Sequence, residues 1–124
     1  MTTITRLIGV YNADGGLVGE ARYVVGHLLG LTSCSLCDIT HSPIRRKPEW
    51  DAMVQKLSVP ITVVHKNELS PELSAWLEDV TLPVVVGVDT DGDFQIVVDH
   101  ETLDNAGGSV QTFREQVETA LSRF

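Results

Sequence analysis

Two cysteines separated by two residues are the most reactive feature of this 124-residue chain. Cys34-Ser-Leu-Cys37 is followed by His41, and Asp38 comes directly after the second thiol. In a short helical turn that ends near His41, with about 100° of rotation per residue, Cys34, Cys37 and His41 share one face. Asp38 lies next to that face. We therefore expect two sulfurs, an imidazole and a carboxylate to lie close together.

Thiol–disulfide exchange is the first chemistry that this arrangement favours. Cys34 would be the attacking thiolate, because a position at a helix N-terminus lowers the pKa of a thiol. His41 would assist it as a cation or a base. Cys37 would resolve the mixed disulfide. Asp38 acts in the opposite direction, because a neighbouring negative charge raises the pKa of a thiol.

Metal binding is the second interpretation. Two thiolates and an imidazole are suitable ligands for zinc or a related ion, and three ligands leave a fourth position open. The candidates for that position are His27, His65, His100, Asp38 or a residue from a second chain. In a third interpretation the cysteines are small packed residues, and the domain is an interaction module without chemistry of its own.

The composition narrows the classes of partner. A formal charge of -8, from 17 acidic and 9 basic residues, disfavours nucleic acid and anionic membrane surfaces. No run approaches the roughly 18 apolar residues of a membrane span, and the first residues do not resemble a signal peptide. We therefore expect a cytoplasmic protein whose partner is another protein or a small thiol. In that compartment a C-x-x-C pair is more often catalytic or metal-binding than a structural bridge.

The rest of the sequence predicts the elements that position this pair. Alternating and continuous apolar runs predict strands at 7–11, 60–64, 83–88 and 94–98. Helical spacing and capping residues predict helices at 17–29, 48–57, 70–79 and 109–123, the third of which should bury Leu73, Trp76 and Leu77. Residues 31–47 break the pattern and form a cysteine-bearing insert. The prediction is a single domain covering residues 1–124.

Two polar segments between these elements are predicted to be turns. Asn12-Ala-Asp-Gly-Gly16 separates the first strand from the first helix and lacks the lysine of a phosphate-binding loop. Asp89-Thr-Asp-Gly-Asp93 joins the last two strands and lacks the glycine and glutamate positions of a calcium-binding loop. A β-hairpin turn accounts for the second segment.

With the insert set aside, the elements follow the order β-α-β-α-β-β-α, and Pro83 stands directly before the first strand of the hairpin. In this order, in the pair Cys34/Cys37 and in Pro83, residues 5–123 resemble the thioredoxin-like superfamily. The resemblance implies a three-layer α/β sandwich whose mixed sheet of about four strands is flanked by helices. It also implies redox activity and a cis Leu82–Pro83 bond that faces the thiols. This chain carries the thiols behind a predicted helix rather than directly after the first strand.

Overall fold

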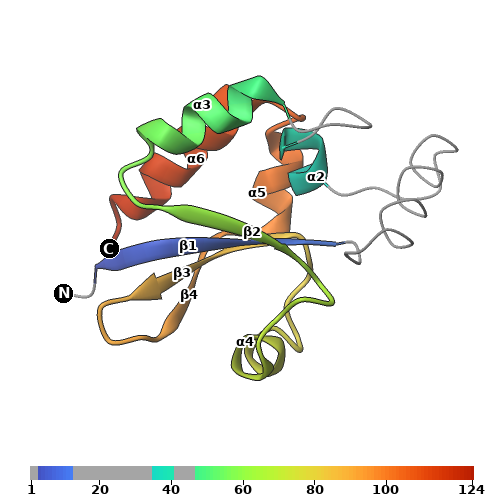
Figure 1. Ribbon diagram of the computed structural model, residues 1–124, viewed down its shortest axis with the longest axis vertical. Helices are drawn as coiled ribbons and strands as arrows, with labels where there is room; N and C mark the ends of the chain where they lie inside the picture. The colour runs from blue at the N-terminus through green and yellow to red at the C-terminus, as the bar shows by residue number, and fades with distance from the viewer. Residues whose placement is uncertain (1–2, 13–34, 41–46) are drawn as a thin grey trace, which may run out of the picture.

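The computed structural model describes residues 3–12, 35–40 and 47–124 (Figure 1). In chain order the elements are β1 (Ile4–Tyr11), α2 (Ser35–Thr40), α3 (Pro48–Lys56), β2 (Ile61–His65), α4 (Pro71–Trp76), β3 (Val84–Asp89), β4 (Phe94–Val98), α5 (His100–Asn105) and α6 (Val110–Leu121). All four predicted strands are confirmed, with bounds that differ by a few residues. The predicted helix at 17–29 lies outside the described residues.

The strands form one mixed sheet in the order β2-β1-β3-β4. β1 and β2 are parallel, with Leu7 opposite Ile61 and Tyr11 opposite His65. β3 runs antiparallel to both of its neighbours, β1 and β4. This arrangement confirms the predicted mixed sheet of four strands, in which a helical connection joins a parallel pair and a short turn joins the last two strands.

The helices begin where the sequence offers capping groups. Pro48 and Pro71 occupy first-turn positions. A backbone N–H there would have no partner within the helix, so its absence in proline costs no hydrogen bond. The Ser70 hydroxyl accepts from the N–H of Leu73 at 3.2 Å, and Ser109 caps α6 in the same way. A similar signal was missed at Asp99, whose carboxylate accepts from the N–H of Thr102 at 2.9 Å and caps the unpredicted helix α5.

One face of the sheet carries the larger core, beneath α2, α3, α5 and α6 (Figure 1). Trp50 of α3 and Phe113 of α6 pack ring against ring, with their centroids 5.3 Å apart. The other buried residues of this core include Ile4, Leu7, Tyr11, Leu36, Ile39, Met53, Val85, Val97, Leu103 and Val117. The predicted helices at 48–57 and 109–123 therefore both pack an apolar face against this core.

Among the described helices, only α4 packs on the opposite face (Figure 1). Leu73 and Leu77 are buried there against Val84, Val86 and Val88 of β3. The prediction that Trp76 is buried was wrong, because 38% of its surface is exposed. Its ring lies beside Phe94 of β4, at a centroid distance of 5.5 Å, so it covers the margin of this smaller core.

Candidate functional site

The residues that carry the predicted chemistry are only partly within the described part of the chain. Cys34, His41 and the alternative ligand His27 lie outside it. Cys37 and Asp38 belong to α2, of which the structure describes the backbone and the side chains of Leu36, Ile39 and Thr40. The grouping of two sulfurs with an imidazole therefore stays a prediction. The part of the site that the structure describes is the packing of α2 against the sheet.

Helix α2 is anchored at the carboxyl end of β1. Leu36 and Ile39 are fully buried in the larger core, and Thr40 is buried as well. The Thr40 hydroxyl shares a hydrogen bond of 2.6 Å with the Tyr11 hydroxyl, and Tyr11 is the last residue of β1. The Thr40 carbonyl accepts from the N–H of Lys47 at 2.8 Å. Apolar burial and a buried polar contact thus hold the backbone of the cysteine-bearing helix on the sheet.

The chain segment before β3 reaches the same place. Val84 lies opposite Val10 in the antiparallel β1–β3 pair, so the buried Pro83 comes next to Tyr11. The Leu82–Pro83 peptide bond is cis. The expected isomer is therefore present, and the bond lies at the end of the sheet where α2 is anchored.

His65 is the third part of this end of the sheet. Its ring lies 5.1 Å from that of Tyr11, centroid to centroid, at an angle of 57°. The Glu68 carboxylate accepts from the backbone N–H of His65 at 2.7 Å and approaches its Nδ1 at 2.6 Å. These two contacts, the backbone one first, hold the pKa of Glu68 below its ordinary value of 4.5. Because an ionised carboxylate can only accept, Nδ1 of His65 is the donor, and the contact fixes the orientation of the imidazole.

Of the alternative ligands named from the sequence, His65 and His100 are both at this end of the sheet. β1, β2 and β4 run in the same direction, so their last residues share one margin. His65 ends β2, and His100 follows β4 as the first residue of α5, a helix that contacts α2. The two histidines belong to opposite edges of the sheet, with β1 and β3 between them. His65 is connected to α2 through side chains, because its ring lies beside Tyr11, whose hydroxyl shares a hydrogen bond with Thr40.

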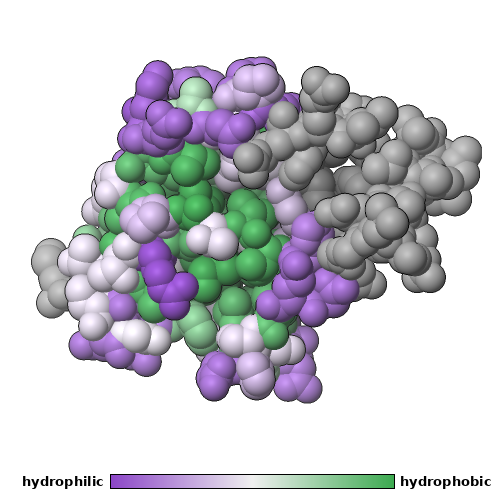
Figure 2. All heavy atoms as spheres, in the orientation of Figure 1, coloured by the Kyte–Doolittle hydropathy of each residue, from purple (hydrophilic) through white to green (hydrophobic). Residues whose placement is uncertain are grey.

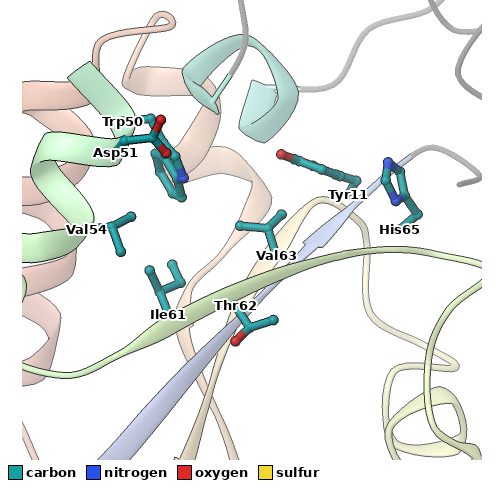
Figure 3. A pocket seen from close by; sticks show the side chains of 8 residues that line it. All are labelled: Tyr11, Trp50, Asp51, Val54, Ile61, Thr62, Val63 and His65. Carbon is teal, nitrogen blue, oxygen red and sulfur yellow. The ribbon is translucent and has the colours of Figure 1, made fainter. Parts of the chain in front are cut away.

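A hollow of about 430 Å³ opens beside these residues, between α3 and β2. It is lined by Tyr11, Trp50, Asp51, Val54, Ile61, Thr62, Val63 and His65 (Figure 3). Hydrophobic residues gather at the centre of this face of the molecule, below α3, with hydrophilic residues around them (Figure 2). The sequence predicted a helix at 48–57 and a strand at 60–64 but no pocket between them, because the hollow depends on how α3 packs against the edge strand.

The hairpin turn at the opposite end of the sheet holds three carboxylates. Asp89, Asp91 and Asp93 are the only group of three metal-ligating side chains that lie together within the described residues. The Asp89 carboxylate accepts from the N–H groups of Asp91 and Asp93 at 2.9 and 3.0 Å, and from the Gln95 amide at 3.2 Å. Burial acts to raise the pKa of Asp89, but these hydrogen bonds outweigh it and keep the pKa below its usual value. The predicted hairpin turn is confirmed.

Comparison with known proteins adds no assignment to this geometry. No protein-family model, no curated protein and no solved structure matches the chain. Within the described ranges, none of the helices has the length and apolar character needed to cross a membrane. The fold defines an α/β protein with a mixed four-stranded sheet, and the candidate site lies at the carboxyl end of β1.

Proposed function

We propose that this chain is a small cytoplasmic thiol–disulfide redox protein with a thioredoxin-like fold, acting through Cys34 and Cys37. The observation that supports it most is that α2 and Pro83 meet at one end of β1. The sequence singled out both features independently, through the thiol pair and through Pro83. The parallel β1–β2 pair followed by the β3–β4 hairpin agrees with the arrangement that the resemblance implies.

The proposed reaction moves two electrons to the disulfide of a protein or a small thiol compound. Cys34, as thiolate, attacks one sulfur of that disulfide and expels the other sulfur as a thiolate. Cys37, once deprotonated, attacks Cys34 in the mixed disulfide and expels the second partner thiolate. The chain is left with a Cys34–Cys37 disulfide, and the partner thiolates take up the protons that the two cysteines lost. His41 and Asp38 would adjust the fraction of Cys34 that is ionised.

Titration of the thiols in glutathione buffers tests this function. Over about −150 to −300 mV, the chain should lose two reactive thiols together and recover both on reduction. Cys34→Ser and Cys37→Ser variants should each retain one thiol that forms only mixed disulfides with glutathione. If the two thiols never pair anywhere in this range, the redox function is excluded.

A zinc-type site is the second candidate function, and His65 is the observation that favours it. Histidines that bind metals commonly donate the N–H of their other ring nitrogen to a carboxylate, as the Nδ1–H of His65 does to Glu68. Cys34, Cys37 and His41 would supply three ligands and His65 the fourth. Metal analysis of freshly purified protein should then find close to one ion per chain, and His65→Gln should lower that content. Metal-free protein that takes up no zinc on titration would exclude this alternative.

A further inference from the structure

β2 is an edge strand of the described sheet, with β1 on one side of it. The backbone of an edge strand exposes a row of hydrogen-bonding groups that can pair with another extended chain. Where those groups point can be read from the bonds at the two ends of β2.

At the start of β2, the Pro60 carbonyl accepts from the N–H of Leu7 at 2.8 Å, so residue 60 directs its main chain toward β1. At its end, His65 donates its N–H to the Glu68 carboxylate and accepts from the N–H of Glu68 at 2.9 Å. Successive residues of a strand point their main-chain groups to opposite sides. Ile61 and Val63 therefore share the outward direction of His65. In the described ranges of the chain, no strand pairs with that side.

The hollow between α3 and β2 lies directly beside this open edge. Ile61 and Val63 point to the side of β2 on which Trp50 and Val54 of α3 lie, and Thr62 points the other way (Figure 3). Ile61 and Val63 thus each combine outward main-chain groups with an apolar side chain that faces the hollow, whereas Thr62 between them turns its main chain toward β1 and its side chain away. An extended peptide meets both requirements, because its backbone can pair with the strand while every second side chain enters a pocket.

The charge of the site indicates which peptide fits. Asp51 supplies the carboxylate in the lining of the hollow, and Glu68, ionised at neutral pH, closes the far end of the open edge. The whole chain carries a formal charge of -8. A segment in which basic residues alternate with apolar ones would therefore place cations near the two carboxylates and an apolar side chain in the hollow.

We propose that the β2 edge and the hollow beside it bind an extended, basic segment of a partner protein, which adds to the sheet as a further strand. The site needs no thiol, so its existence does not depend on the redox function. In a redox protein, it would hold a partner chain close to the end of the sheet where α2 is anchored.

The test uses the full chain and a fluorescein-labelled Lys-Ile-Lys-Phe-Lys peptide with blocked termini. Binding is followed by fluorescence anisotropy, and the amides of Ile61 and Val63 are followed by NMR. The proposal expects saturable binding in which these two amides become protected from hydrogen exchange. The same peptide with alternate backbone nitrogens methylated should bind about tenfold more weakly or worse, because it has lost its edge-facing donors.

Variants locate the contact. Val63→Pro removes an outward N–H without removing a β1–β2 hydrogen bond, and proline is tolerated at such edge positions. It should keep the fold, seen by circular dichroism, and lose most of the peptide affinity. Ile96→Lys, on the opposite edge strand β4, is the matched control and should bind as the wild type does. If Val63→Pro does not fold, the methylated peptide on wild-type protein still decides the question.

Three results would overturn the proposal. The first is no binding of the peptide at millimolar concentration. The second is binding that is indifferent to backbone methylation, which would mean that no strand is added. The third is protection of the Ile61 and Val63 amides before peptide is added, because the edge would then be occupied by another segment or a second copy of this chain. Cys34→Ser/Cys37→Ser protein should bind the peptide unchanged, so failure of the redox function leaves this result untouched.

Discussion

The two ends of the sheet are built in different ways. The turn at the hairpin end is held mainly by contacts within the short segment from Asp89 to Gln95, with one distant backbone hydrogen bond from the N–H of Thr90 to the Thr3 carbonyl at 3.0 Å. The carboxyl end of β1 is assembled from residues far apart in the chain: Tyr11 meets Thr40, 29 positions away, and also His65 and Pro83. Local contacts make a turn, whereas distant contacts bring chemically useful groups together.

The largest expected effect on the free energy of unfolding comes from weakening the packing of α2 at the carboxyl end of β1. Leu36 is fully buried. It packs so closely over Gly9 that a Cβ added there would lie 3.2 Å from Leu36 Cδ2. Leu36→Ala removes these buried contacts and should lower the free energy of unfolding by about 2–5 kcal/mol. Urea denaturation measures the loss.

Trp76→Ala is the control for this prediction. It removes a larger side chain, but one that is 38% exposed, and should cost clearly less than Leu36→Ala. Equal losses from the two variants would show that α2 is not held by its buried face. In the redox assay, Leu36→Ala should also change the rate of thiol pairing more than Trp76→Ala does.

The second effect concerns the hydroxyl contact between Tyr11 and Thr40. Tyr11→Phe and Thr40→Val each remove one side of a buried 2.6 Å hydrogen bond and should each cost about 1 kcal/mol. The double variant should cost less than the two single losses added together, because the contact is lost only once. Strict additivity in this double-mutant cycle would mean that the two hydroxyls do not stabilise each other.

The third effect belongs to the hairpin end. Gly92 has a φ of +83°, and in the described part of the chain no atom outside its two neighbours lies within 4 Å of the position of an added Cβ. Gly92→Ala should therefore cost about 1–2 kcal/mol through backbone conformation alone. Gly92→Asn should cost less, because asparagine enters this region more readily. If thermal denaturation gives the same loss for both variants, the positive φ is not the cause.

This difference between the ends explains what the sequence could predict. The hairpin, the helix starts near Ser70 and Ser109 and the four strands follow from neighbouring residues, and the structure confirms them. Helix α5 was missed because the capping signal of Asp99, directly after β4, was not recognised. Trp76 was predicted to be buried because helical spacing shows which residues share a face of the helix. It does not show how far the sheet extends beneath that face.

The candidate site was harder to predict because its described contacts join different elements. His65 was named from the sequence only as one of several alternative ligands. Its partner Glu68 could have been found, since a histidine at a strand end followed three residues later by glutamate permits this local contact. The contact between Tyr11 and Thr40 had no local signal, because it requires the packing of α2 on β1.

The smallest expected effect is the pH dependence of the Glu68–His65 contact. The pKa of Glu68 is held below 4.5 in the folded chain, so the folded state favours the ionised carboxylate more than the unfolded state does. The stabilisation is therefore present in full above about pH 4.5 and is lost as the pH falls through the lowered pKa. Because half of the Glu68 side chain is exposed, the effect on stability should be slight. Glu68→Gln should lower the melting temperature at pH 7, and its difference from the wild type should shrink as the pH falls through the lowered pKa of Glu68. A difference that stays the same over the whole acid titration would mean that the carboxylate charge contributes nothing to this end of the sheet.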